Sequence, residues 1–265
     1  MSRTLTEVFA ATQAEGRAAL IGYLPAGFPD PARCVELITD MVEAGVDIVE
    51  VGLPYSDPLM DGPAIQEAVD LALREGTNTD TVLDTVAAVT ASGATALVMS
   101  YWNPIERYGV ERFADRLADG GGHGVITPDL TPEEAGPWID ATTRRGLDRV
   151  FLVAPSSTDA RIATVCSVTS GFIYAASTMG VTGARSHVSS AAPGLVARTK
   201  AITSLPVAVG LGVSTGEQAR EVAGYADGVI VGSAFVRQIL DAADHNQARA
   251  GVRALAADLA TGVRR

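Results

Sequence analysis

Lysine is almost absent from this sequence: Lys200 is the only one, and histidine occurs only at positions 123, 187 and 245. Lys200 lies in a segment with helical spacing, whereas an enzyme that uses a Schiff base needs a lysine at its active centre. A metal-dependent aldolase or hydrolase needs histidine and carboxylate ligands that lie together. Because the three histidines fall in different predicted elements, the sequence argues against lysine-based and metal-based chemistry.

Cysteine and long apolar runs are also scarce. Cys34 and Cys166 are far apart in apolar helical segments, so we interpret them as reduced core residues rather than a disulfide or metal ligands. No hydrophobic run reaches the roughly 18 residues that a membrane span needs. The N-terminal segment, residues 1–16, is polar and amphipathic and does not resemble a signal peptide. We therefore expect a cytoplasmic protein without membrane contact.

Acidic residues outnumber basic ones by 31 to 20, which gives a formal net charge of -11. Neither nucleic acid nor an anionic membrane attracts a chain of this charge as a whole. We therefore expect a small-molecule substrate and no nucleic-acid partner. The 265 residues are 47% hydrophobic, enough for a large core, and no change of composition divides them. We predict a single domain that spans residues 1–265.

Short runs rich in Val, Ile and Leu alternate with segments in which apolar residues have helical spacing. Strict alternation of this kind is typical of a (βα)8 TIM barrel in the α/β class, and we predict this fold with an extra N-terminal helix. A doubly wound parallel sheet is the alternative, which differs in strand order. The eight predicted strands are Ala19–Leu24, Val46–Val51, Thr95–Ser100, Gly124–Pro128, Arg149–Val153, Gly171–Ala176, Pro206–Gly210 and Gly228–Val231.

Helix starts are marked by capping signals at three places. An acidic residue before proline is typical of an N-cap followed by the first helical position. A Ser or Thr followed three residues later by Glu fits a capping box. We expect helices to begin at Asp30-Pro31, at Thr131 with Glu134, and at Ser214 with Glu217.

The most informative stretch, residues 46–63, reads VDIVEVGLPYSDPLMDGP. Glu50 lies inside its apolar strand, where a carboxylate costs free energy unless it is satisfied or used. We expect Val46, Ile48 and Glu50 to share the face that points into the core. The C-terminal ends of barrel strands are where such folds place their chemistry. Burial is expected to raise the pKa of Glu50, so that this side chain can deliver as well as accept a proton.

Three carboxylates of this stretch also have a structural interpretation. Glu50 is alternatively a buried group that is hydrogen-bonded to the backbone. Asp61 is either a second catalytic carboxylate or the cap of the helix that begins near Pro63. Asp57, which precedes Pro58, is more typical of a turn or of an interface than of a catalyst.

Glycines follow the late predicted strands, in GLGVS at residues 210–214 and VGSA at residues 231–234. Exposed backbone N–H groups, a helix N-terminus and the Ser233 hydroxyl together favour an anion pocket, in the position where barrels hold phosphate. Ordinary tight turns are the alternative.

The polar loop at residues 177–190 is predicted to close over a ligand, with Gly183 as a further donor. A disordered surface loop is the alternative. Apolar residues near the predicted mouth suggest that the remainder of a phosphorylated substrate is apolar or aromatic; they are Tyr23, Leu53, Met99 and Leu211. The sequence therefore favours proton transfer without a metal or cofactor.

Several segments, in one order along nearly the whole chain, resemble the tryptophan synthase alpha subunit family. This family is a (βα)8 barrel that cleaves indole-3-glycerol phosphate to indole and glyceraldehyde 3-phosphate in tryptophan biosynthesis. The resemblance therefore implies a carbon–carbon lyase. The segments are EVGLPYSDPLMDGPAIQEA from Glu50, GYLPAGFPD from Gly22, SYWNPIERYG from Ser100, STMGVTGAR from Ser177, GLGVS and VGSAFV.

The resemblance also implies roles for single residues. Glu50 and Asp61 match the two catalytic carboxylates, and Thr182 matches a closing-loop threonine that hydrogen-bonds to the second of them. Pro54 and Asp57 match the surface that meets the beta subunit. The implied substrate-binding set is Tyr23 and Tyr101 near the indole, Tyr174 in the site wall, Thr182 and Gly183 in the loop, and Gly212, Gly232 and Ser233 at the phosphate.

Three positions depart from the enterobacterial pattern. Thr178 stands in place of an Arg, and Leu211 and Tyr23 each stand in place of a Phe. These departures concern the loop contacts and the shape of the indole pocket, and leave the reaction unchanged.

The chemistry implied by the resemblance is a retro-aldol cleavage. Glu50 is expected to handle the protons at indole C3 and at the neighbouring hydroxyl, while Asp61 accepts the indole N–H. The implied partner is a beta subunit that carries pyridoxal phosphate, in an alpha2-beta2 complex that passes indole through an internal channel. No cofactor is expected in this chain.

Three alternatives remain open from the sequence. The first is a stand-alone lyase that releases indole, and the second is a non-catalytic activator of a beta subunit. The third is another phosphate-binding barrel enzyme, such as an isomerase or a synthase of the same pathway. The lack of a lysine at a strand end argues against the synthase, and both carboxylates argue against the non-catalytic activator.

Overall fold

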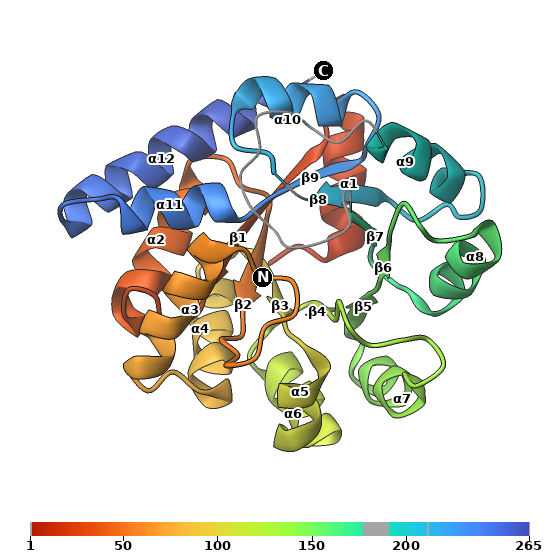
Figure 1. Ribbon diagram of the computed structural model, residues 1–265, viewed down its shortest axis with the longest axis horizontal. Helices are drawn as coiled ribbons and strands as arrows, with labels where there is room; N and C mark the ends of the chain where they lie inside the picture. Colours follow the sequence, from red (N-terminus) through yellow and green to blue (C-terminus); the bar gives the residue numbers. More distant parts are fainter. Residues whose placement is uncertain (1, 177–190, 211, 265) are drawn as a thin grey trace.

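The computed structural model describes residues 2–176, 191–210 and 212–264. Parallel strands form one sheet that curls into a nearly closed barrel inside a ring of helices (Figure 1). The strands follow the order β5-β4-β3-β2-β1-β9-β8-β7-β6, so that the sheet runs around the barrel in sequence and the doubly wound alternative is wrong. Their bounds are β1 Ala19–Pro25, β2 Ile48–Gly52, β3 Thr95–Met99, β4 Gly124–Ile126, β5 Asp148–Val150, β6 Leu152–Val153, β7 Ile173–Ala176, β8 Val207–Gly210 and β9 Gly228–Val231.

The predicted fifth strand contains the seam of the barrel. It is divided into β5, which pairs with β4, and β6, which pairs with β7. Phe151 lies between the two pieces, and its carbonyl accepts a hydrogen bond from the amide of Tyr174 at 3.2 Å. One covalent segment therefore connects the two edges of the sheet, which is why eight predicted strands give nine strand segments.

Helices surround the strands and precede the first of them. The helix before β1 confirms the extra N-terminal helix, and it begins with a capping box formed by Thr4 and Glu7. The helix bounds are α1 Leu5–Ala14, α2 Pro31–Glu43, α3 Pro63–Arg74, α4 Thr79–Ala91, α5 Trp102–Tyr108, α6 Val110–Asp119, α7 Gly136–Arg145, α8 Asp159–Val168, α9 Ala192–Lys200, α10 Gly216–Ala223, α11 Ser233–Leu240 and α12 His245–Gly262.

The three predicted helix starts have different outcomes. Asp30 caps α2 as predicted, because its side chain accepts from the amide of Arg33. The capping box at Thr131 is wrong, since residues 131–134 form a turn and α7 begins only at Gly136. In α10 the cap is Thr215, one residue later than predicted.

Two apolar layers hold the barrel together. The inner layer fills the barrel with side chains that alternate along the strands, and α1 closes its N-terminal end, with the rings of Phe9 and Phe172 5.6 Å apart. The outer layer lies between the strands and the surrounding helices. Ile48 belongs to the inner layer, and Glu50, two residues later in β2, points the same way. Val46 lies before β2 and packs in the outer layer, so the predicted common face does not include it.

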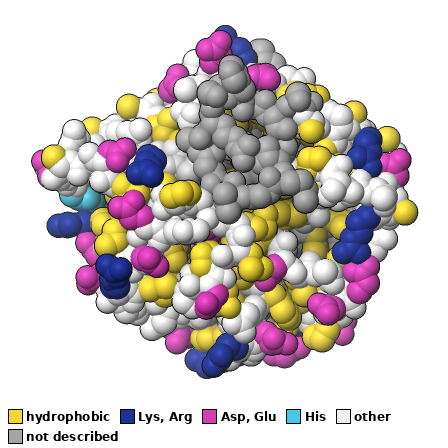
Figure 2. Space-filling view, viewed as in Figure 1, with side chains coloured by type: hydrophobic (Ala, Val, Ile, Leu, Met, Phe, Trp, Pro, Cys, Tyr) yellow, Lys and Arg dark blue, Asp and Glu magenta, His cyan; other side chains and the backbone are white. Residues whose placement is uncertain are grey.

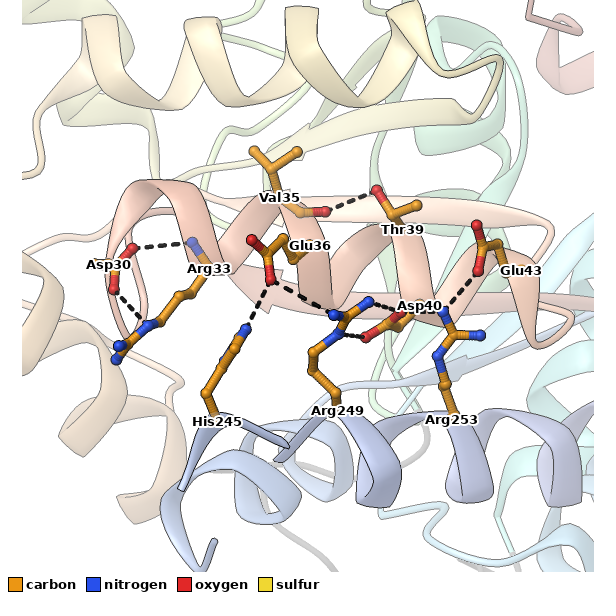
Figure 3. Close-up of polar contacts among 10 residues, drawn as sticks. All are labelled: Asp30, Arg33, Val35, Glu36, Thr39, Asp40, Glu43, His245, Arg249 and Arg253. Carbon is orange, nitrogen blue, oxygen red and sulfur yellow. Dashed lines mark hydrogen bonds and ion pairs between the residues drawn. The ribbon is translucent and has the colours of Figure 1, made fainter. Parts of the chain in front are cut away.

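A row of charged side chains joins the last helix, α12, to α2 (Figure 3). The Asp40 carboxylate is completely buried and accepts from Arg249 at 2.6 and 2.9 Å. Arg253 pairs with both Asp40 and Glu43, and His245 Nε2 lies 2.8 Å from Glu36. These contacts hold α12, from the C-terminal end of the chain, against the first helix after β1.

Candidate active site

A pocket opens at the C-terminal ends of the strands, where the sequence predicts the site. The empty space between its lining residues, with the open solvent at the mouth included, is about 670 Å³. The structure brings together these sequence-predicted residues around it: Tyr23, Glu50, Leu53, Asp61, Met99, Tyr101, Tyr174, Gly212, Gly232 and Ser233.

Some lining residues of the pocket were missed by the sequence analysis, and some predicted site residues lie outside the described part of the chain. Ile230 was within reach, because it lies in the predicted strand Gly228–Val231, two residues before Gly232. Thr178, Thr182, Gly183 and Leu211 lie outside the described residues. The other missed lining residues are Ile65, Ser100 and Pro128.

Glu50 lies in the middle of β2 on the inner face of the barrel. Its side chain is 1% exposed, and its Oε1 atom has no hydrogen-bond partner among the described residues. A purely structural buried carboxylate is normally hydrogen-bonded, so this environment favours the functional interpretation. Burial raises the pKa of Glu50 to about 8, the direction expected from the sequence. The side chain is therefore mostly protonated at neutral pH and able to deliver a proton.

Asp61 lies in the loop between β2 and α3 and is half-buried. The hydroxyl of Tyr101 donates to its Oδ1 atom at 3.0 Å. Burial raises the pKa of Asp61, and this hydrogen bond opposes that shift. The N-cap of α3 is Gly62. The alternative role of Asp61 as the cap of this helix is therefore wrong. Asp61 instead lines the pocket.

Two tyrosines line the pocket together with Glu50. Tyr23 lies opposite Glu50 in the register of β1 and β2, and Tyr174 belongs to β7. Burial raises the pKa of both phenols, and the charge of Glu50 adds to this effect. Both side chains therefore stay protonated and neutral at the pocket wall.

The opposite side of the pocket is formed by backbone rather than by carboxylates. Gly212, in the left-handed region at φ 86°, follows β8, and Gly232 is the N-cap of α11, which begins at Ser233. A helix N-terminus presents N–H groups and a positive dipole end, which favour an anion. The pocket thus has an acidic end and an end suited to phosphate.

The other described residues singled out in the sequence do not line the pocket. Lys200, in the outer helix α9, lies 2.8 Å from Asp227 and far from the site, at the rim of a different hollow. Cys34 and Cys166 are free thiols. Pro54 is buried and Asp57 exposed, both in the loop that leads to Asp61.

No cluster of three or more His, Cys, Asp or Glu side chains suited to a metal ion occurs among the residues that the structure describes. No helix within those same ranges is long and apolar enough to cross a membrane. On the face seen in Figure 2, Lys and Arg side chains lie towards the rim and hydrophobic ones gather nearer the centre.

Fold and site together define a class: an enzyme of the (βα)8 barrel type, with ionisable groups and an anion-binding end in one pocket at the strand ends. Comparison with known proteins specifies it further. The family model described as "Tryptophan synthase alpha chain" matches residues 9–264. The tryptophan synthase alpha chain of Acidothermus cellulolyticus is 61% identical over 96% of this chain and 94% of its own length. That of Thermobifida fusca is 59% identical over 98% and 97%.

A solved structure of Mycobacterium tuberculosis tryptophan synthase superposes on this chain with a TM-score of 0.93. The two are 52% identical, and the match covers 100% of each chain. The chain belongs to the tryptophan synthase alpha chain family. It is a lyase of tryptophan biosynthesis, and its reaction is the cleavage of indole-3-glycerol phosphate to indole and glyceraldehyde 3-phosphate.

Proposed function

We propose that Glu50 and Asp61 are the catalytic residues of this reaction. The observation that carries the proposal is the Glu50 carboxyl, buried in the pocket with an Oε1 atom that has no partner among the described residues, and with a pKa of about 8. A group held near its pKa at working pH can both give and take a proton. Asp61 shares the same pocket.

The reaction needs three events at the indole end. Glu50 gives a proton to indole C3 and takes the proton of the neighbouring side-chain hydroxyl. The bond between C3 and the side chain then breaks, its electron pair returns to the indole ring, and the hydroxyl carbon becomes the aldehyde. Asp61 accepts a hydrogen bond from the indole N–H, which gains positive charge when C3 is protonated.

The rest of the pocket aligns the substrate. Gly212, Gly232 and Ser233 hold the phosphate with backbone N–H groups and a hydroxyl, while the aromatic ring lies among Tyr23, Tyr101 and Tyr174. Binding at the phosphate, remote from the reacting bond, places C3 against Glu50. Thr182 and Gly183 complete the proposal as closing-loop residues on the basis of the family resemblance.

The experiment compares each catalytic substitution with a matched control on the exposed face of α3. Glu50→Gln is expected to lower turnover of indole-3-glycerol phosphate by about 100- to 10,000-fold, the range for a lost general acid or base. Asp61→Asn is expected to lower it by about 100- to 1,000-fold, the range for one lost interaction with developing charge. Glu67→Gln and Asp70→Asn change the same chemical groups where they are exposed, and should keep normal turnover. Binding of a glycerol-phosphate analogue should persist in all four. Wild-type turnover in Glu50→Gln or Asp61→Asn would refute that residue's role.

Family membership also supports a partner, namely a tryptophan synthase beta subunit in an alpha2-beta2 complex. In this proposal pyridoxal phosphate resides in the partner, this chain works without a cofactor, and the complex operates in the cytoplasm. The loop with Pro54 and Asp57 is the proposed contact, and Leu59 within it is 70% exposed. Copurification with a beta subunit, with a rise in alpha activity, tests the complex. No association at micromolar concentration favours the stand-alone lyase.

A further inference from the structure

The hydroxyl of Tyr101 is the meeting point of three consecutive residues in the loop between β2 and α3. It accepts from the amide of Leu59 at 3.2 Å and from that of Met60 at 2.9 Å. It donates to Asp61 Oδ1 at 3.0 Å. Backbone amides only donate and a carboxylate only accepts, so the single phenolic proton must lie on the bond to Asp61.

Tyr101 is itself held on a rigid part of the barrel. It follows β3 and directly precedes α5. Ser100 Oγ donates to the carbonyl of Tyr101 at 2.7 Å, and the amide of Trp102 donates to Asp129 Oδ1 at 2.9 Å. The ring of Tyr101 packs on that of Tyr55, with centroids 5.6 Å apart. The Tyr101 hydroxyl therefore connects the loop between β2 and α3 to a side chain that is held in place at the ends of β3 and β4.

The geometry points to Tyr101 as a positioning residue for the lyase reaction: its hydroxyl holds the Asp61 carboxylate, and the two amides before it, in the orientation that accepts the indole N–H. This inference rests on the proposed role of Asp61. One carboxylate oxygen is engaged by the phenol, and the substrate N–H binds the other. A carboxylate at the end of a loop would otherwise turn freely about its side-chain torsions.

The phenol is suited to this task over the whole working range of pH. Burial, followed by the negative charge of Asp61, raises the pKa of Tyr101 far above its ordinary value. Tyr101 therefore remains a donor to Asp61 wherever the protein is folded. Its bond to the ionised carboxylate is charge-assisted, which makes it stronger than a bond between neutral groups.

The test is a double-mutant cycle on purified full-length protein with indole-3-glycerol phosphate. Tyr101→Phe keeps the ring and removes the hydroxyl, and is expected to lower kcat about 10- to 100-fold, the range for one hydrogen bond to a charged group. KM should change little, because the lost orientation matters most as charge develops. In the Asp61→Asn background the same substitution should cost less than about threefold.

Tyr55→Phe is the matched control. It removes a hydroxyl from the ring packed on Tyr101, where that oxygen accepts from Asn103 at 2.8 Å, and should keep normal kcat. An equal loss from Tyr101→Phe in both backgrounds would overturn the inference, because the two residues would then act independently. Normal activity in Asp61→Asn alone would instead overturn the proposed function, so the two failures are distinguishable.

A pH profile separates positioning from a loss of folding. The hydrogen bond from Tyr101 lowers the pKa of Asp61, so Tyr101→Phe should move the acid limb of kcat/KM to higher pH. The other titratable groups that line the pocket beside Asp61 are Glu50, Tyr23 and Tyr174, and all remain in the variant. Tyr55→Phe should leave the limb in place. A reduced rate with an unmoved acid limb would show a merely structural role and overturn the inference.

Discussion

A Cβ atom added to Gly210 would lie 2.1 Å from the phenolic oxygen of Tyr174. Gly210 ends β8 and Tyr174 lies in the neighbouring strand β7. The wall of the pocket thus depends on glycine at position 210, because the absence of a Cβ atom there leaves space for the Tyr174 ring from the next strand. Gly52 and Tyr23 repeat this relationship on β2 and β1, at 2.4 Å.

Gly210→Ala should displace the Tyr174 ring and reduce both activity and stability. We expect the free energy of unfolding to fall by about 1–3 kcal/mol, the range for overpacking a core, together with a rise in KM for the substrate. Gly194→Ala is the control, because a Cβ there meets no atom of the described residues outside its own helix within 4 Å. Urea unfolding and steady-state kinetics measure both variants, and a normal pocket in Gly210→Ala would contradict the argument.

Glu50 should make stability depend on pH. Its pKa is about 8 in the folded chain and about 4.3 when unfolded. Between these values the unfolded chain releases a proton that the folded chain retains, so the free energy of unfolding falls as pH rises, by up to about 1.4 kcal/mol per pH unit. Glu50→Gln removes this contribution and Glu67→Gln does not. Urea unfolding from pH 5 to 8 measures it, and parallel curves for wild type and Glu50→Gln would argue against the assignment.

Ser233 should matter only for a substrate that carries phosphate. Ser233→Ala is expected to raise KM for indole-3-glycerol phosphate about tenfold or more, because it removes a hydrogen bond to a charged group, with kcat within about threefold. With the dephosphorylated compound, indole-3-glycerol, the variant and the wild type should behave alike. Ser204→Ala, exposed at the other end of the barrel, serves as the control. An equal effect on both substrates would place the phosphate elsewhere.

Asp40 should stabilise the fold at neutral pH but not in acid. Burial alone raises the pKa of its carboxyl, yet hydrogen bonds and charge from Arg249 and Arg253 outweigh burial and hold that pKa below the ordinary value. Its contribution is therefore present above about pH 4 and is lost as pH falls through the folded-state pKa.

Asp40→Asn should lower the free energy of unfolding at pH 7 by about 1–3 kcal/mol, the cost of a broken buried hydrogen bond. A larger effect is not expected, because the side chains of Arg249 and Arg253 are 38% and 43% exposed and water screens their charge. The difference from wild type should shrink as pH falls through the folded-state pKa of Asp40. Glu36→Gln, at an exposed position of the same row, is the control. A difference that persists in acid would contradict the charge argument.

Much of the fold was predictable because it depends on local patterns. Strand and helix periodicity alternates along the chain, which predicts parallel strands connected by helices without knowledge of any long-range contact. The strand order that distinguishes a barrel from a doubly wound sheet came from the structure. The two-residue period likewise placed Glu50 on the inner face, since Ile48 and Glu50 are both in β2. Val46 was misplaced because the strand begins two residues later than the apolar run.

The remaining features were decided by contacts between distant residues. The hydroxyl of Tyr101 reaches Asp61 across 40 positions, and Asp40 meets Arg249 across 209, distances over which a single sequence carries no pairing signal. Sequence spacing alone did not decide whether Asp61 or its neighbour caps α3. The backbone of the folded chain places the N-cap at Gly62. Local chemistry thus determined which residue types stand at the strand ends, whereas only closure of the barrel decided which of them meet, because that choice depends on packing between segments far apart in the chain.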